Sequence, residues 1–182
     1  MPGPAFLRDE TVELRTVEEE DLEFVRDAVN DPEVWRTLGS ATPKNLQTEE
    51  AWLERISEDD EDIRLLVCDG GDPVGFVGLH VTETWGLGEF GYWVVPEHWG
   101  NGYCTAAVRL MAEYAFDQRR LHKVAADVYD HNPGSARVLE KVGFEREGVR
   151  HGEAYVDGEY RDLLRYGLLD SEFDRGDGRD GP

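Results

Sequence analysis

Two glycines, Gly100 and Gly102, stand between an apolar, strand-like stretch and an amphipathic, helix-like stretch of the sequence. A helix amino terminus leaves its first amide hydrogens unpaired and carries a partial positive charge, so a turn that exposes these amides binds anions such as phosphate. Glycine favours such a turn because it places no side chain between the backbone and the ligand. The segment WGNGYCT, residues 99–105, therefore predicts an anion site made of backbone amides.

This turn differs from the common glycine-rich nucleotide motifs. It lacks the lysine of a P-loop, GxxxxGK[ST], and its spacing does not fit the GxGxxG of dinucleotide folds. Cys104, just after the second glycine, has two interpretations: a small buried residue, or a nucleophile that carries an acyl group. No motif places a histidine base beside this thiol, which favours the buried residue.

A second segment with chemical potential is DHNPGSARVLEKVGF, residues 130–144. Asn132 precedes Pro133, the pattern of a helix N-cap followed by proline at the first helical position. Gly143 then ends the helix. Ser135 falls in its first turn, where a hydroxyl is either a plain polar side chain or part of a site.

Together the two segments resemble the signatures of the GNAT superfamily of acyl-CoA-dependent N-acyltransferases, especially the RimJ and RimL ribosomal-protein N-acetyltransferases. In the first signature, (Q/R)-x-x-G-x-(G/A), Gly102 matches, whereas Trp99 and Cys104 replace the usual residues. In the second, an Asn begins a helix that ends in K-x-G-F, as do Asn132 and residues 141–144. The resemblance extends over about residues 11–169.

The resemblance implies acetyl-CoA (coenzyme A) as co-substrate, with no metal. In the family the amides of the glycine turn hold the pyrophosphate, a splayed strand pairs with the pantetheine arm, and the asparagine of the second signature hydrogen-bonds that arm. The cofactor-binding residues expected on this basis are Val94, Val95, Trp99, Gly100, Asn101, Gly102, Tyr103, Cys104, Thr105, Asn132 and Ser135.

The same resemblance suggests the catalytic residues. Many members carry a tyrosine seven positions after the asparagine, which protonates the departing thiolate, but here that position is Leu139. In the RimL-like branch a serine at the position of Ser135 is thought to assist the thiolate. Two carboxylates are candidates for the general base, Glu89 and Glu153, and the alignment at Glu153 leaves a shift to Ala154 open.

The acceptor is expected to be a primary amine, with a protein N-terminal α-amine as the leading expectation from the ribosomal-protein comparison. An α-amine has a pKa of about 7.7–8.0 and lysine about 10.4, so an α-amine needs only a weak base. The amine would attack the thioester directly in a ternary complex. Two alternatives stay open: a small-molecule amine as acceptor, and a non-catalytic acyl-CoA-binding module.

The elements that must position these residues follow from periodicity. Apolar and alternating runs predict strands at residues 11–17, 63–68, 74–84, 89–95 and 122–130, the middle three forming an antiparallel meander. Helical spacing predicts helices at residues 18–31, from Pro32, from Thr48, after the glycine turn and after Asn132. A hairpin is expected around the Asp157-Gly158 turn.

These elements predict a mixed α/β protein with the GNAT acyltransferase fold, in which helices flank a central, mostly antiparallel, twisted sheet of six to seven strands. The chain has 182 residues, which suits one domain, expected over residues 1–169. Residues 170–182 are polar and rich in glycine, and are expected to form a disordered acidic tail.

Charge and composition limit the partners. The net charge is −21, from 40 acidic and 19 basic residues, which argues against nucleic acid as a partner. The acids are spread along the whole chain, which predicts a surface adapted to high salt, with a basic partner or substrate as the alternative.

The remaining features point to a cytoplasmic protein. The two cysteines, Cys68 and Cys104, are too few for a disulfide framework, and no Cys/His cluster has metal-ligand spacing. The amino terminus has no signal-peptide pattern, and no run approaches the roughly 18 apolar residues that cross a bilayer. We expect no membrane partner, and a monomer or homodimer.

Overall fold

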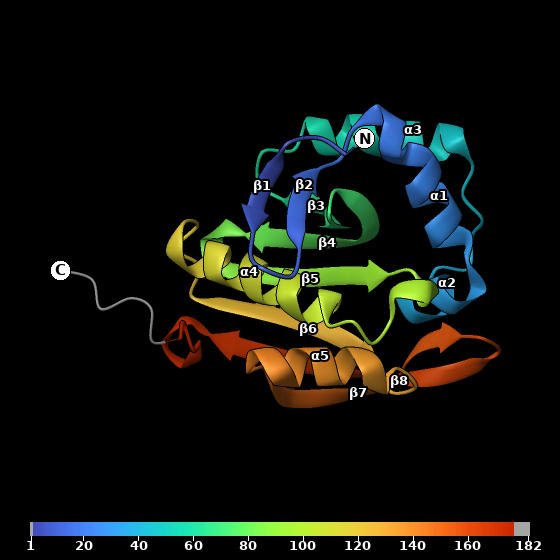
Figure 1. Ribbon diagram of the computed structural model, residues 1–182. Helices are drawn as coiled ribbons and strands as arrows, with labels where there is room; N and C mark the ends of the chain where they lie inside the picture. Colours follow the sequence, from blue (N-terminus) through green and yellow to red (C-terminus); the bar gives the residue numbers. More distant parts are fainter. Residues whose placement is uncertain (1, 177–182) are drawn as a thin grey trace.

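An eight-stranded sheet forms the centre of the protein in the computed structural model, which describes residues 2–176 (Figure 1). The strand order is β1-β2-β3-β4-β5-β6-β8-β7, and every neighbouring pair is antiparallel except β5 and β6. The strands are β1 (Ala5–Arg8), β2 (Glu13–Thr16), β3 (Ile63–Asp69), β4 (Asp72–Thr82), β5 (Leu87–Val94), β6 (Lys123–Tyr129), β7 (Glu145–Val156) and β8 (Glu159–Leu169).

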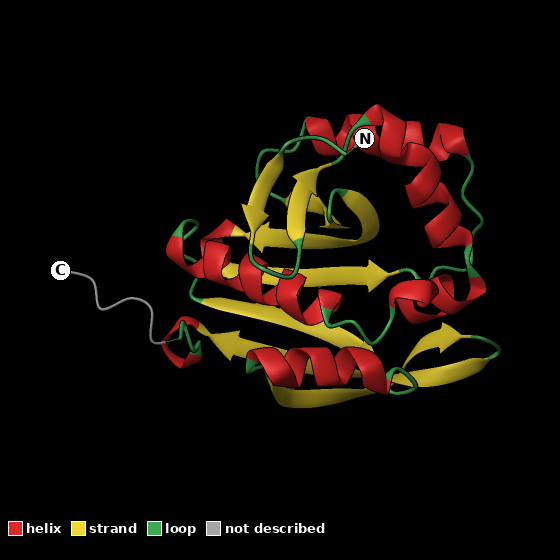
Figure 2. Cartoon of the chain, viewed as in Figure 1, coloured by secondary structure: helices red, strands yellow, loops and turns green. Residues whose placement is uncertain are grey.

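Helices lie over both faces of this sheet (Figure 2). The helices α4 and α5 contact each other and belong to one face, and α1, α2 and α3 form a group on the other. The bounds of the α-helices among the described residues are α1 (Leu22–Asn30), α2 (Pro32–Leu38), α3 (Leu46–Ser57), α4 (Tyr103–Asp117) and α5 (Pro133–Val142).

The larger core lies between the sheet and the helices α4 and α5. In β4, Val77, Leu79 and Val81 are buried in it, because alternate residues of a strand point to the same face. Met111 of α4 and Leu139 of α5 fill the same core and are fully buried. Each such aliphatic side chain contributes about 1.5–3 kcal/mol by leaving water.

A smaller core lies on the opposite face, under the first three helices. Leu66 and Cys68 of β3 and Trp93 of β5 pack there against Val25 of α1 and Val34 of α2. This cluster holds α2 against the end of β5. The helix α2 therefore borders the space beside that strand.

The parallel pair, β5 and β6, separates partway along its length. Residues 87–90 pair with residues 123–126, and the pairing stops at Phe90 and Ala126. Beyond that point the two strands continue without a ladder between them, so their facing backbone groups are open to other partners.

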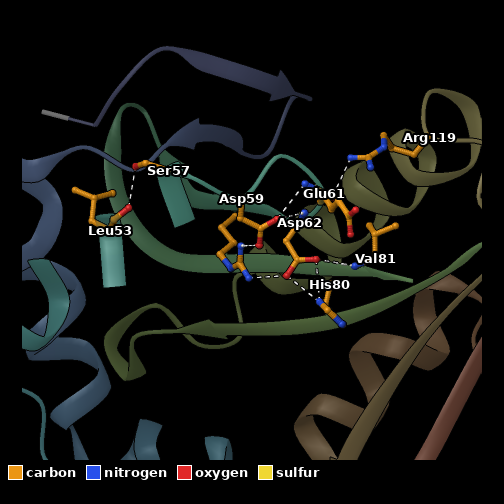
Figure 3. Close-up of polar contacts among 9 residues, drawn as sticks. Leu53, Ser57, Asp59, Glu61, Asp62, His80, Val81 and Arg119 are labelled. Carbon is orange, nitrogen blue, oxygen red and sulfur yellow. Dashed lines mark hydrogen bonds and ion pairs between the residues drawn. The ribbon is translucent and has the colours of Figure 1, made fainter. Parts of the chain in front are cut away.

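A polar cluster fixes the loop between α3 and β3 (Figure 3). The Asp62 carboxylate, whose side chain is 6% exposed, accepts hydrogen bonds from the Val81 amide at 2.8 Å and from Arg64 Nη2 at 2.6 Å. His80 Nδ1 lies 2.8 Å from the same carboxylate, and this hydrogen bond raises the pKa of the His80 imidazole. Arg119, two residues beyond the end of α4, donates to the Glu61 carbonyl at 3.0 Å and connects the segment after that helix to the loop.

The mixed α/β fold, the meander β3-β4-β5 and the hairpin around Asp157-Gly158 agree with the sequence prediction. The sheet has eight strands rather than six to seven, because residues 5–8 add the edge strand β1, which the sequence analysis did not predict. The strand β7 also begins earlier than the predicted hairpin, at Glu145. The helix α3 begins at Leu46 rather than Thr48, since the Asn45 side chain caps it by accepting from the Thr48 amide.

The expectation of a disordered tail from residue 170 is wrong for its first residues. Asp170–Glu172 form a 3-10 helix, and Phe173 is buried in the larger core against Phe116. Phe173 is the apolar residue in this polar stretch, and burying its ring outweighs the cost of ordering a short turn. The last part of the predicted tail, residues 177–182, lies outside the described residues.

Within residues 2–176, no helix is both long enough and apolar enough to cross a membrane. In the same range, the side chains of His, Cys, Asp and Glu form no group of three or more that is suited to hold a metal ion.

Candidate active site

A cavity of about 710 Å³ opens where β5 and β6 separate. Residues 90–94 of β5 and 126–129 of β6 form its sides. The glycine turn, the first turn of α4 and one side of α5 close it on one face of the sheet. Val34, Thr37 and Leu38 of α2 close it on the other, so the cavity passes through the gap in the sheet.

The glycine turn forms one end of this cavity. Gly100 and Gly102 have φ angles of 82° and 84°, in the left-handed region, and a Cβ at either residue would meet no atom within 4 Å. Glycine is therefore required here by backbone conformation and not by crowding. Gly102 is the N-cap of α4, and no side chain caps this helix.

The first turn of α4 also contains no acidic residue, although the chain as a whole carries a net charge of −21. The amides of Tyr103, Cys104 and Thr105 thus begin a 15-residue helix that has neither a side-chain cap nor a carboxylate to neutralise its positive end. These three residues line the cavity, so its wall offers backbone donors to an anion.

Neighbouring side chains hold the turn in shape. Trp99 Nε1 donates to the Val94 carbonyl at 2.7 Å, and Asn101 Nδ2 donates to the His98 carbonyl at 3.1 Å. The Tyr103 hydroxyl donates to Asp69, which joins α4 to the end of β3. Trp99 and Tyr103 line the cavity, whereas Asn101 does not, so Asn101 supports the turn from outside.

Cys104 lies at the cavity wall, and burial raises the pKa of its thiol to about 12. A thiol with that pKa is protonated at neutral pH and is a poor nucleophile. The geometry therefore favours the interpretation of Cys104 as a small packed residue.

The valines at the end of β5 differ from each other. Val94 lines the cavity, but its carbonyl already accepts the Trp99 ring N–H. Val95 does not line it: its amide donates to the Val74 carbonyl at 3.0 Å, and its side chain packs in the smaller core. Residues 91–94 run beside β6 without a ladder, so the backbone groups on that side of β5 can pair with a ligand.

The first turn of α5 lies across the cavity from β5. Asn132 caps the helix by accepting the Ser135 amide at 3.2 Å, and both residues line the cavity. The Tyr92 hydroxyl lies 2.8 Å from Ser135 Oγ and 3.1 Å from the Ser135 carbonyl. Burial raises the pKa of the Tyr92 phenol, and the hydrogen bond with Ser135 offsets part of that increase.

Two cations line the same side of the cavity, Arg137 and Lys141 of α5. They lie four positions apart, on one side of the helix. Within residues 2–176 neither makes an ion pair with a carboxylate, so both remain available to an anionic ligand. The sequence analysis named neither as a site residue: Lys141 entered only as the lysine of the K-x-G-F signature, and Arg137 belongs to no motif.

The two carboxylates predicted as bases, Glu89 and Glu153, do not line the cavity, but one row of ion pairs joins them. Glu89 Oε1 lies 2.5 Å from Arg165 Nη1, which is 3.2 Å from Asp127 Oδ2. Arg150 Nη2 lies 2.5 Å from the same Asp127 oxygen, and Arg150 Nε lies 4.0 Å from Glu153. We name this row, from Glu89 to Glu153, the carboxylate row.

Asp127, at the centre of the carboxylate row, lines the cavity, and it is the one carboxylate among the described residues that does so. It alternates with Ala126 and Val128, which point into the larger core, so Asp127 and Tyr129 point to the face that α2 covers. Burial and the Asp127 charge raise the pKa of the Tyr129 phenol. No sequence signal marked Asp127, because its partners come from strands distant in sequence.

A cavity that crosses a gap in a sheet, with free helix amides and two cations on one side, suits a long ligand with a phosphate group and defines the class of acyl-CoA-dependent transferases. A family model described as an acetyltransferase (GNAT) domain matches residues 11–145, and the chain belongs to this family. It is an acetyl-CoA-dependent N-acetyltransferase.

Several known proteins are similar to this chain over most of its length. A spermidine N(1)-acetyltransferase of Escherichia coli is 27% identical over 165 residues, which are 90% of this chain and 88% of that protein. A crystal structure of spermidine N-acetyltransferase from Vibrio cholerae, in complex with CoA and spermine, has a TM-score of 0.85 and 25% identity and covers 90% of this chain and 98% of that one. A further structure of the Vibrio cholerae enzyme is described as dodecameric.

A putative ribosomal N-acetyltransferase of Bacillus subtilis is more similar in sequence but over a shorter stretch. It is 36% identical over 105 residues, which are 57% of each chain.

Proposed function

We propose that this N-acetyltransferase acetylates small cationic amines of the polyamine type. The observation that carries the proposal is the charge on the two sides of the cavity: Arg137 and Lys141 on the α5 side, and Asp127 on the α2 side. Similarity to spermidine acetyltransferases along nearly the whole chain supports the same acceptor class. This acceptor corresponds to the small-molecule alternative of the sequence analysis, in place of the protein amino terminus.

Acetyl-CoA, when bound, supplies the acetyl thioester. The α4 amides of residues 103–105 would hold its pyrophosphate, and Arg137 and Lys141 would neutralise further phosphate charge. Asn132 and the cavity-facing backbone of residues 91–94 would orient the pantetheine arm. Each of these groups faces the cavity, which supports the fit of the ligand to this chain.

The α2 side of the cavity suits a flexible amine with methylene segments. Leu38, Trp93 and Tyr129 offer apolar and aromatic surface, and Asp127 offers a carboxylate for an ammonium group. The carboxylate row contains three carboxylates and two arginines, so its formal charge is −1 and favours a cation.

The carboxylate row also supplies the base that the reaction needs. An alkylammonium group with a pKa near that of lysine, about 10.4, must lose a proton before its nitrogen can attack. We propose that Asp127 orients the amine, and that Glu89 or Glu153 takes the proton through water, since both belong to the same ion-pair row.

A protein amino terminus remains the second candidate acceptor, favoured by the 36% identity to the putative ribosomal N-acetyltransferase over 57% of the chain. The two acceptors are distinguished by measuring thiol release from acetyl-CoA with spermidine, spermine, a neutral primary amine and a short peptide with a free amino terminus. We expect kcat/KM for the polyamines to exceed that for the peptide by at least about tenfold, since each desolvated charge contact is worth about 1.5–3 kcal/mol. Preference for the peptide would overturn the polyamine proposal.

A further inference from the structure

We propose that Tyr92 is a positioning residue that aims the Ser135 hydroxyl at the sulfur of the departing thiolate. The inference rests on the N-acetyltransferase function and holds for any acceptor amine. It addresses the missing tyrosine on α5, where the position expected to carry a general acid is Leu139, which is fully buried and apolar.

The geometry restricts where the two hydroxyl protons point. The Tyr92 hydroxyl is 2.8 Å from Ser135 Oγ and 3.1 Å from the Ser135 carbonyl, and it has a single proton to donate. If that proton goes to the carbonyl, the contact between the two hydroxyls requires Ser135 to donate its own proton to the Tyr92 oxygen. If it goes to Ser135 Oγ, the shorter contact, the Ser135 proton is free to point into the cavity that both residues line.

An anion in the cavity selects the second arrangement. A hydroxyl that accepts one hydrogen bond donates a stronger one, so Tyr92 donating to Ser135 strengthens the bond from Ser135 to a negatively charged sulfur. Tyr92 holds Ser135 from the strand side, and Asn132 holds its backbone by accepting the Ser135 amide at 3.2 Å. The hydroxyl is thereby preorganised, which is what makes a hydrogen bond effective in a transition state.

Tyr92 keeps its proton under all ordinary conditions, because burial raises the pKa of its phenol. It therefore serves as a permanent hydrogen-bond donor and not as a proton source. During the transfer, the C–S bond of the thioester breaks as the N–C bond to the amine forms, and the sulfur leaves with the bonding electron pair. The nitrogen loses one proton and the sulfur gains one through solvent, so Tyr92 and Ser135 are unchanged.

The test is a double-mutant cycle on the single-turnover rate of acetyl transfer, with Tyr92→Phe, Ser135→Ala and both together, using the best amine of the acceptor panel. We expect Tyr92→Phe to lower this rate about tenfold and Ser135→Ala about 10- to 100-fold, no more than the lower end of the roughly 10²- to 10⁴-fold of a general acid, because Ser135 only donates a hydrogen bond to the sulfur. In the Ser135→Ala background, Tyr92→Phe should not lower the rate further. The Kd for CoA, measured by calorimetry, should stay within about twofold of the wild-type value in these variants.

Tyr166→Phe is the matched control. Tyr166 also extends from a strand to α5, where its hydroxyl donates to Glu140 at 3.1 Å, and it is buried. This variant should leave the transfer rate unchanged. The proposal is overturned if Tyr92→Phe lowers the transfer rate equally in the wild type and in Ser135→Ala, or if Tyr166→Phe lowers it by a similar factor. Either result would show that Tyr92 has only a structural role.

The cycle also separates this proposal from that of the acceptor. If the enzyme prefers a peptide to polyamines, the polyamine proposal is wrong, but the double-mutant cycle still tests the role of Tyr92. Ser135→Thr retains a hydroxyl and should retain the dependence on Tyr92, whereas loss of that dependence would contradict the positioning role.

Discussion

Glu89 and Glu153 are the two ends of one row of ion pairs whose centre is Asp127. The two glutamates are 64 residues apart in sequence and lie on different strands. The row crosses β5, β6, β8 and β7, which are neighbours in the sheet. Since Asp127 alone of the three lines the cavity, the carboxylates are expected to differ in what they contribute.

The first prediction concerns these carboxylates. Asp127→Asn should raise KM for the polyamine about tenfold and leave KM for acetyl-CoA unchanged, because it removes the negative charge on the acceptor side. Of Glu89→Gln and Glu153→Gln, the variant that removes the general base should instead lower kcat and shift its pH dependence. Steady-state kinetics between pH 6 and 9 measure both effects, and an acceptor KM that ignores Asp127→Asn would contradict the assignment.

The second prediction concerns the glycine turn. Gly102→Ala places a side chain at a φ of 84°, which should cost about 1–2 kcal/mol of stability and distort the cradle of α4 amides. The matched control is Gly158→Ala, at a φ of 85° in the β7–β8 turn, where a Cβ also meets no atom within 4 Å. Both variants should lose similar stability in chemical denaturation, but only Gly102→Ala should weaken CoA binding in calorimetry. Equal binding by both variants would mean that the turn is not a phosphate site.

The third prediction concerns Arg137 and Lys141. Arg137→Gln and Lys141→Gln should each weaken acetyl-CoA binding by about three- to tenfold, and the loss should shrink as salt rises, since mobile ions screen these contacts. Arg8→Gln, an exposed position on β1 away from the cavity, is the control for the change in net charge. Calorimetric titrations at low and high salt measure the effect, and a loss that salt does not alter would contradict a phosphate contact.

The fourth prediction concerns His80. Its pKa is raised by the hydrogen bond to Asp62, so the charged pair stabilises the fold below the ordinary histidine pKa of about 6.5. That contribution is lost as pH rises through the raised pKa. His80→Gln should therefore cost up to about 1 kcal/mol near pH 5.5 and less near pH 9, since the imidazole is largely exposed. Denaturant unfolding at the two pH values measures the difference, and an equal cost at both would exclude the ion pair.

The fifth prediction concerns the net charge of −21. Repulsion among so many carboxylates should lower stability in dilute buffer, and salt should restore it as the screening length falls from about 30 Å at 0.01 M to about 3 Å at 1 M. Thermal unfolding across this range should show a Tm that rises with salt. A flat response would favour the alternative, that the acidity serves a basic partner.

The parts of the cavity wall that the glycine turn and the first turn of α5 form were predictable, because their motifs are local in sequence. The glycine turn and the cap of α5 each lie within a few consecutive residues, and Gly102, Asn132 and Ser135 all line the cavity. The contact between Tyr92 and Ser135 joins residues 43 apart, and Asp127 meets partners 23 and 38 residues away. Such pairs depend on sheet order and register, which a single sequence does not reveal.

The errors in the fold have similar local causes. The strand β1 has four residues and only half-buried alternation, so its pairing with β2 and not its sequence makes it a strand. At α3, Asn45 is the N-cap, but Thr48, three residues later, is also a residue type that caps helices. The sequence prediction therefore started the helix too late. The first residues of the predicted tail are ordered because Phe173 is buried against Phe116 and Arg175 pairs with Asp117 and Asp170.

The gap between β5 and β6 has a mechanical consequence. The strands β1 to β5 and β6 to β8 are two antiparallel halves, and four residue pairs of one short parallel ladder are their backbone connection. The halves are therefore joined mainly by side chains, above all by α4, whose buried face packs on both. Since α4 is the helix proposed to hold the phosphates, a ligand bound at its amino terminus is expected to stabilise the packing between the two halves.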